Sequence, residues 1–149
     1  MRVRDANHFD IPVMLDMLRA YRSKTPLPFL AEIDDASYMT SLLTQLMAGK
    51  GAAFVAEDDY GVVGMLLANI AHSLWSPKHL VMQEMAYWVN PDARGGSAGY
   101  RLLSAYVELG KVLKENGRIH AFFISKMTNS PDIKYDKFGF SKLEEMWVA

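Results

Sequence analysis

The sequence predicts an α+β protein in which one mixed, mostly antiparallel sheet is flanked by helices. Two observations carry this prediction. Segments with helical apolar spacing alternate with short runs rich in Val, Ile, Tyr, Phe and Trp, and a hairpin of strands precedes a strand, helix, strand crossover. The chain has 149 residues, of which 50% are hydrophobic, so one domain spanning 1–149 can bury a sizeable core.

The N-terminal third predicts a short strand and a helix. Arg2 to Ala6 is a candidate strand, and the apolar spacing predicts a helix from about Ile11 to Arg22. We expect Asp10 to be the N-cap of that helix, with Pro12 in its first turn. Two prolines in residues 24–29 cannot continue the helix, because proline lacks the N–H donor, so a loop follows.

The next segment predicts a helix followed by a hairpin. Helical spacing runs from about Ala36 to Ala48, and Gly49 can take the left-handed position that ends such a helix. Ala52 to Glu57 and Val62 to Ala71 are expected strands. The residues 58–61, Asp-Asp-Tyr-Gly, form a turn signal between them.

The second half predicts a crossover. Leu80 to Val89 is an expected strand that Asn90-Pro91-Asp92 stops, and a loop over 93–99 leads into a long amphipathic helix ending near Asn116-Gly117. A strand over Ile119 to Ser125 follows.

The C-terminal segment predicts two further elements. Asp132 to Lys137 is an expected short helix, which Gly139 ends, and Leu143 to Val148 is an expected final strand.

Composition excludes several functional classes. The net charge of −1 and the scattered basic residues give no support to nucleic-acid binding, and the chain has no cysteine for a disulfide, a thiolate zinc site or a thiol nucleophile. The four histidines lack the paired spacing of a metal site. The N-terminus carries charge where a signal peptide needs an apolar run, and no apolar run can cross a membrane, so we expect a cytoplasmic protein.

The loop before the long helix is the most informative stretch. Its run Arg94-Gly95-Gly96-Ser97-Ala98-Gly99 opens the helix, where unpaired backbone N–H groups and the helix dipole favour an anion. Glycine lets a phosphate approach the backbone closely, and Arg94 adds a positive charge. The alternative is an ordinary surface turn rich in small residues.

Two motifs carry a resemblance to a known family. The segment Val89-x-Pro91-x-x-Arg94-Gly95-x-x-x-Gly99 resembles the coenzyme A signature of the GCN5-related N-acetyltransferase (GNAT) superfamily. The run Tyr135-Asp136-Lys137-Phe138-Gly139-Phe140 resembles a second motif of the same enzymes, and the order of elements is similar across nearly the whole chain. Residues 84–89 also resemble acetyltransferases encoded by bacteriophages.

The resemblance implies a function and a site. It implies transfer of an acetyl group from acetyl-coenzyme A to a primary amine, directly and without metal, with Tyr135 protonating the leaving thiolate and Glu84 acting as general base. A packing aromatic and a solvated carboxylate are the alternatives for these two residues, and a water chain can replace the base. The implied cofactor residues are Trp88, Val89, Arg94, Gly95, Gly96, Ser97, Ala98, Gly99 and Asn129.

The acceptor is less defined. By the family layout, Phe29 and Trp75 would border its pocket, and the apolar residues near Phe29 suggest an acceptor with some hydrophobic body. Small amines, antibiotics, peptide N-termini and protein lysines all remain open as acceptors. The resemblance also allows a homodimer, although no patch in the sequence establishes one.

Two other functions compete with this prediction. The family pattern has a small residue where this chain has Ser97, so the fold could persist as a catalytically inactive module that binds a cofactor or a protein. Gly95-Gly96-Ser97-Ala98-Gly99 also matches the nucleophile elbow of hydrolases. A proline and an arginine separate this serine from its strand, and the order of acid and histidine that such a triad needs is absent, so a hydrolase is disfavoured.

Overall fold

The computed structural model describes residues 1–149 and contains one five-stranded sheet. The strands lie in the order β1-β2-β3-β4-β5, and neighbours along this order pair antiparallel except for β4 and β5, which are parallel. This confirms the predicted mixed, mostly antiparallel sheet. The strands are β1 (Arg2–Asp5), β2 (Gly51–Asp58), β3 (Gly61–His72), β4 (Leu80–Val89) and β5 (Ala121–Phe123).

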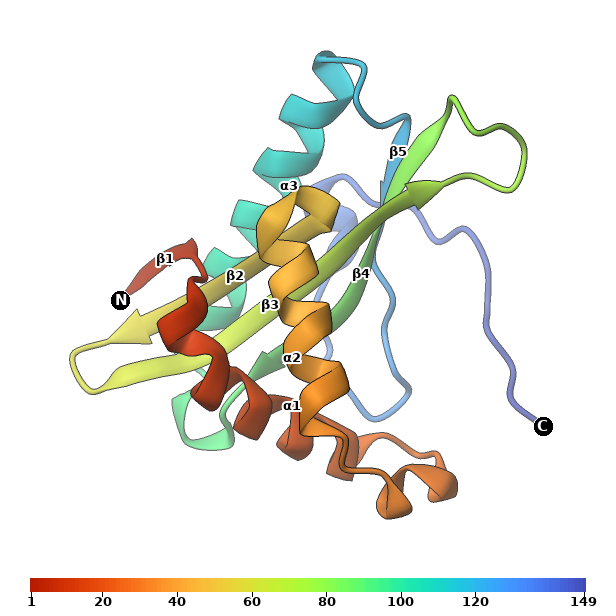
Figure 1. Cartoon of the computed structure of the whole chain (residues 1–149). Coiled ribbons are helices and arrows are strands. Elements are labelled where there is room, and N and C mark those ends of the chain that lie inside the picture. Colours follow the sequence, from red (N-terminus) through yellow and green to blue (C-terminus); the bar gives the residue numbers. More distant parts are fainter.

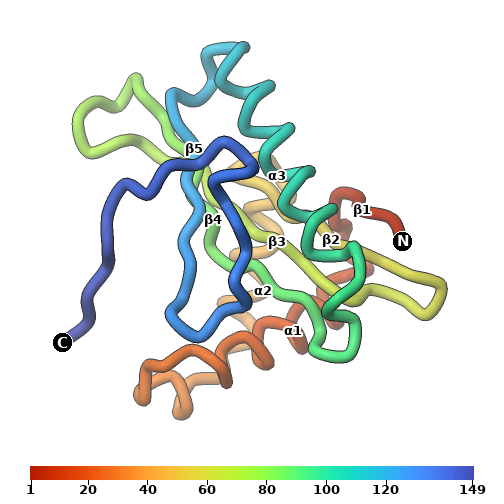
Figure 2. The backbone as a smooth tube through the Cα atoms, turned by 180° about the vertical axis from the view of Figure 1, so that it is seen from behind, coloured from red at the N-terminus to blue at the C-terminus, as the bar shows by residue number.

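Helices cover both faces of the sheet. The helices α1 (Ile11–Lys24) and α2 (Ala36–Gln45) pack on one face, and α3 (Ala98–Glu115) packs on the other (Figures 1 and 2). Each face has its own core, with Met14 and Leu43 buried on the first side and Leu102 and Tyr106 on the second. None of the helices has the length and apolar character needed to span a membrane.

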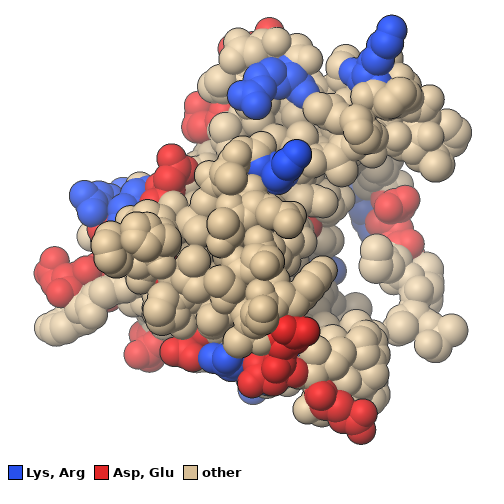
Figure 3. Space-filling view, viewed as in Figure 1, with Lys and Arg blue, Asp and Glu red and all other residues tan.

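Short helical turns connect these elements. The turns η1 (His8–Asp10) and η2 (Pro28–Glu32) flank α1, η3 (Leu46–Lys50) follows α2, and η4 (Pro91–Ala93) and η5 (Tyr135–Phe138) belong to the second half. On the face of Figure 3, charges of both signs are scattered, and the area over α2 is largely uncharged.

Most elements of the first half confirm the predictions. The hairpin turn lies between Asp58 and Gly61, and Gly49 adopts the left-handed backbone (φ 103°) that ends the α2 region. The α-helical part of α2 stops at Gln45, earlier than expected, because the chain widens there into the η3 turn.

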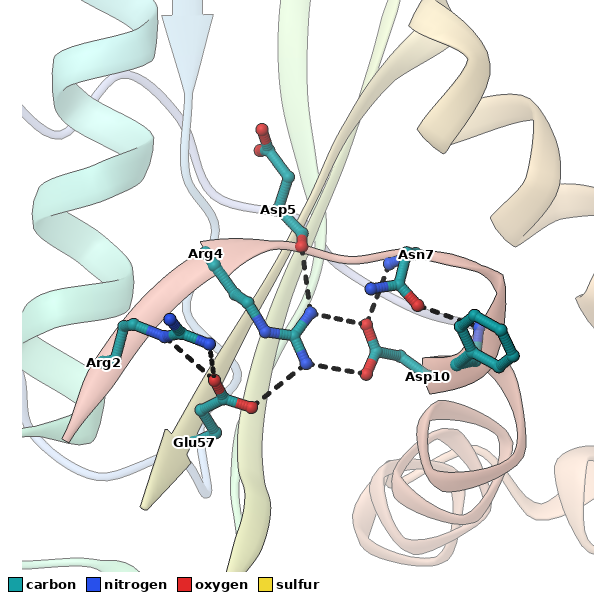
Figure 4. Close-up of polar contacts among 7 residues, drawn as sticks. Arg2, Arg4, Asp5, Asn7, Asp10 and Glu57 are labelled. Carbon is teal, nitrogen blue, oxygen red and sulfur yellow. Dashed lines mark hydrogen bonds and ion pairs between the residues drawn. The ribbon is translucent and has the colours of Figure 1, made fainter. Parts of the chain in front are cut away.

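Asp10 occupies the expected N-cap position of α1, but its side chain makes no capping bond to that helix. Its carboxylate instead accepts a hydrogen bond from the Asn7 amide and two from the Arg4 guanidinium (Figure 4). Arg4 also donates to Glu57 of β2, to which exposed Arg2 binds as well. This network ties β1, the start of α1 and β2 together around the buried Asp10.

Strand β4 contains one residue more than its partner requires. Leu67 pairs with Ala86 and the next residue of β3, Ala68, pairs with Glu84, so Met85 is an extra residue, a β-bulge. In a regular strand every second side chain lies on the same face of the sheet, so Met82 and Ala86, four residues apart, should share a face. Met82 instead packs in the α3-side core and Ala86 in the α1-side core. The bulge therefore reverses which side chains of β4 face each layer.

The C-terminal half differs from the prediction in two strands. The strand expected over Ile119 to Ser125 pairs only over Ala121–Phe123, because β4 turns away beyond Gln83. The strand expected over Leu143 to Val148 does not form. Residues 141–149 are exposed and run away from the sheet, where no neighbouring strand offers them hydrogen bonds (Figures 1 and 2).

The Arg4 network generates a stability prediction. Arg4→Ala should lower the free energy of unfolding by about 3 kcal/mol at pH 7, because it leaves the Asp10 carboxylate buried without its charge partner. Arg4 holds the pKa of Asp10 below its ordinary value, so the loss should shrink as the pH falls through the acidic range. Urea unfolding between pH 3 and 7 measures it.

Arg2→Ala is the matched control. The Arg2 side chain is 70% exposed, so its ion pair with Glu57 should contribute at most about 1 kcal/mol. Equal losses in the two variants would contradict the central role given to Arg4.

Candidate functional site

The candidate site is a cavity that opens where β4 and β5 separate. Its volume is about 300 Å³, and 18 residues line it, from α1, β4, the η4 turn and the glycine loop after it, α3, and the segment after β5. Pairing between the two strands ends at Gln83 and Phe123, so the backbone of β4 from Glu84 onward has no strand neighbour on this side. The cavity joins the glycine loop to Glu84 and Tyr135.

Glu84 lies at the point where the strands part. It is only 5% exposed, and its Oε2 accepts hydrogen bonds from the Ser125 hydroxyl (2.9 Å) and, at 3.4 Å, from the Ser125 amide. Burial raises the pKa of Glu84 above its ordinary value, and the two Ser125 donors oppose that rise. A raised pKa makes this carboxylate a stronger proton acceptor than an ordinary glutamate, which is the property a general base needs.

Four tyrosines from four different elements lie close enough to this carboxyl to sense its charge. Tyr21 belongs to α1, Tyr87 to β4, Tyr106 to α3 and Tyr135 to η5, and the Glu84 charge raises the pKa of each. Burial is the larger cause for all four. The phenols are therefore neutral hydroxyls around a single acidic group.

Tyr135, at the start of η5, lines the cavity. Burial, followed by the charge of Glu84, raises its pKa to about 12. At neutral pH its hydroxyl is protonated and available as a donor. Its ring packs edge-on to Phe140, which fixes the start of η5 against the α3-side core.

The glycine loop forms the other end of the cavity. Gly95, Gly96 and Gly99 all line it, and Gly95 has φ 89°, a conformation that L side chains rarely adopt. No side chain caps the N-terminus of α3, so its first amide groups are left without a side-chain partner. These groups suit a bound anion.

Arg94 is held against the end of β4. Its Nε donates to the Val89 carbonyl at 2.8 Å, and its guanidinium lies 4.7 Å from the ring centre of Trp88. Arg94 and Val89 line the cavity. The Trp88 side chain does not, because it is buried in the α1-side core, so only its backbone can serve the cofactor as expected.

Ser97 and Ala98 point away from the cavity. Ala98 is fully buried in the core, and the Ser97 hydroxyl accepts a hydrogen bond from Arg101 on the outer side of α3. Ser97 therefore does not crowd the glycine loop. No histidine contacts its hydroxyl, which removes the basis for a serine nucleophile.

Three other expected site residues lie outside the cavity lining. Asn129 donates to the Lys24 carbonyl at the end of α1, while its neighbours Ser130 and Pro131 line the cavity. Phe29 in η2 is 61% exposed, and Trp75 in the loop between β3 and β4 is 87% exposed. These two segments lie at opposite ends of the molecule (Figures 1 and 2). Their expected roles stay predictions.

Sequence reasoning missed Ser125, Tyr21 and Tyr87 as members of the site. Tyr87 donates a hydrogen bond to the Gly99 carbonyl and so joins β4 to the start of α3. Tyr21 belongs to α1, for which the sequence predicted only a packing role. The one feature that could have indicated a site residue was its hydroxyl on the apolar face of that helix.

Comparison with known proteins identifies the family of this chain. The sequence model of the Acetyltransferase (GNAT) family matches residues 14–140. The chain belongs to this family. No curated protein sequence matches it.

Solved structures share the fold over nearly the whole chain. A transcriptional regulator from Bacillus halodurans C-125 is 21% identical, with a TM-score of 0.72 and 99% of this chain and 97% of that chain covered. A predicted acetyltransferase from Clostridium acetobutylicum, solved with acetyl-CoA, is 15% identical, with a TM-score of 0.71 and coverages of 99% and 94%.

The name of a third neighbour states its acceptor. The ribosomal-protein-alanine N-acetyltransferase from Brucella melitensis biovar Abortus 2308 is 15% identical, with a TM-score of 0.66 and coverages of 100% and 99%. At these identities the likeness shows the GNAT fold of this chain.

The burial of Glu84 generates a second stability prediction. Glu84→Gln should raise the free energy of unfolding at pH 7 to 8, because it removes a charge that the native state desolvates. The raised native pKa means that this gain disappears at low pH, where the carboxyl is protonated in both the folded and the unfolded state. Urea unfolding from pH 4 to 8 measures the difference.

Glu108→Gln on the exposed side of α3 is the matched control and should change the free energy of unfolding by less than about 0.5 kcal/mol. A loss of stability at pH 7 in Glu84→Gln would contradict the cost that burial assigns to this carboxylate.

Proposed function

We propose that this protein transfers an acetyl group from acetyl-coenzyme A to a primary amine. The observation that carries the proposal is the continuity of one cavity, which joins an anion-binding glycine loop to a buried carboxyl and a buried tyrosine hydroxyl. Membership of the GNAT family supports acetyl transfer. The acetyl-CoA in the Clostridium acetobutylicum structure supports the donor.

The residues of the loop fit such a cofactor. A positive-φ glycine at Gly95, two further cavity-lining glycines and an uncapped helix N-terminus suit a pyrophosphate. Arg94 would add charge there, and the unpaired edge of β4 near Trp88 and Val89 would pair with the amides of the pantetheine arm as an added strand does. Asn129 would need to leave the Lys24 carbonyl to join this site.

When bound, acetyl-coenzyme A supplies a thioester whose carbonyl carbon the amine attacks. Glu84 would accept the proton of the amine, because its raised pKa brings it closer to the working pH. Tyr135 would donate its proton to the leaving sulfur, because its pKa of about 12 keeps the hydroxyl protonated at neutral pH. No covalent intermediate on the protein is needed, which suits a chain without cysteine.

The acceptor would be an amine that approaches Glu84. Glu84 is the only acidic side chain that lines the cavity, so it supplies the one charge that attracts an ammonium group. The ribosomal-protein-alanine N-acetyltransferase among the neighbours keeps a peptide N-terminus open as an acceptor beside small amines. Ser97, which favoured an inactive binding module, faces outward and gives that alternative no support.

Ligand-dependent unfolding tests the donor site. At about a hundred times its dissociation constant, acetyl-coenzyme A should stabilise the protein by ~2.7 kcal/mol, a rise in Tm of roughly 5–10 °C. ATP and NAD should give smaller shifts. Arg94→Ala should weaken coenzyme binding by about 1–3 kcal/mol, whereas Arg101→Ala, on the outer side of α3, should leave it unchanged.

The same measurement can reject the donor. No rise in Tm with any coenzyme A thioester at millimolar concentration would remove the enzymatic function and leave a module that binds something else.

Replacement of Tyr135 tests the proton donor. Tyr135→Phe should lower kcat by about one to three decades while the Kd of acetyl-coenzyme A barely changes, because only the hydroxyl is lost. Release of free thiol measures the rate, and calorimetry measures Kd. Tyr60→Phe, in the exposed hairpin turn, is the matched control. A Tyr135→Phe rate equal to that of the unchanged protein would exclude this role.

A further inference from the structure

Ser125 joins β4 to the segment after β5 at the place where the sheet divides. The last paired residues are Gln83 of β4 and Phe123 of β5, and regular strand pairing stops there. Beyond this point Ser125 donates to the Glu84 carboxylate from its hydroxyl at 2.9 Å and from its amide at 3.4 Å. Two bonds to one side-chain carboxylate thus take the place of the backbone pairing.

The two oxygens of Glu84 are used unequally. Both Ser125 bonds end on Oε2, and no protein donor binds Oε1. Glu84 lines the cavity, and no buried side-chain oxygen in the protein lacks a partner, so Oε1 reaches the open cavity. One oxygen is held in place, and the other faces the space where a substrate would bind.

No cation helps Ser125 hold this carboxylate. The titratable groups that the Glu84 charge affects are the phenols of Tyr21, Tyr87, Tyr106 and Tyr135, and the raised pKa of each keeps it uncharged at neutral pH. No lysine, arginine or histidine forms an ion pair with Glu84. The Ser125 donors are therefore the only interactions that favour the ionised form.

We propose that Ser125 is a positioning residue, which fixes Oε2 of Glu84 and leaves Oε1 to take the proton of the acceptor amine. The inference rests on the proposed function, because it assigns Ser125 to the same reaction. In that step an N–H bond of the acceptor ammonium breaks and its proton moves to Oε1. The electron pair left on nitrogen forms the new N–C bond to the acetyl carbon, while the C–S bond of the thioester breaks and its electron pair leaves with the sulfur, which takes the proton of Tyr135.

The chemistry gives a pH-dependent signature. The Ser125 donors favour the charged carboxylate, so their loss should raise the pKa of Glu84 and leave less of the active base at a given pH. The loss of activity should therefore be largest at low pH and should close as the pH rises. A residue that only supports the fold would lower the rate by the same factor at every pH.

The kinetic test compares Ser125→Ala with the unchanged protein from pH 5.5 to 9.5, with one amine acceptor throughout. The ratio of the two kcat/KM values cancels the ionisation of the amine. This ratio should be about 0.1 at the acidic end of the range and should rise toward 1 at the alkaline end. The tenfold difference at the acidic end is the effect expected for the loss of one charge-assisted hydrogen bond. Ser125→Thr retains the hydroxyl and should keep the ratio near 1. A ratio that does not change with pH would overturn the proposal.

A second readout needs no enzymatic activity. In protein labelled with ¹³C at the glutamate carboxyl carbon, the Glu84 signal, identified by its absence in Glu84→Gln, should titrate at higher pH in Ser125→Ala. An unchanged midpoint would overturn the proposal whatever the rates show. Full activity in Glu84→Gln would instead refute Glu84 as the base, and the Ser125 proposal with it, while coenzyme binding would still stand on its own measurement.

Discussion

One extra residue in β4 determines how the site is arranged. Because Met85 has no counterpart in β3, the side chains after it change faces, so Ala86 and Trp88 pack toward α1 and α2 while Tyr87 and Val89 pack toward α3. A bulge also bends its strand and increases its twist. Pairing with β5 stops two residues before it, at Gln83, and the cavity occupies the gap.

The separation of β4 from β5 lowers the stability of the fold, and the proposed acetyl transfer gives a reason for it. A regular sheet would pair β4 with β5 along its length, and a buried apolar residue at position 84 would need no desolvation. Here the edge of β4 is left unpaired, and Glu84 is buried with no cation near it. Natural proteins break the rules of stable packing mostly at functional sites, and both exceptions here face the same cavity.

The sequence predicted what depends on local spacing. Strand and helix patterns predicted β4 to the residue and α3 to within a few, and the glycine loop and Tyr135 were recognised from short motifs. Errors arose where a distant partner decides the outcome. Asp10 is the N-cap residue of α1, yet its carboxylate binds Arg4 of β1 instead of the helix amides. Residues Leu143 to Val148 favour a strand but have no edge to pair with.

The residues of the site also depend on partners that are distant in the sequence. Ser125 contacts Glu84 across 41 residues of sequence, and no local pattern distinguishes this serine from any other after a strand. The family layout suggested Phe29 and Trp75 for the acceptor pocket, yet both side chains are exposed and outside the cavity lining. Residue type marks groups able to do chemistry, but the divergence of β4 from β5 decides which of them meet. The bulge that sets this divergence depends on register between two strands, which a single sequence does not encode locally.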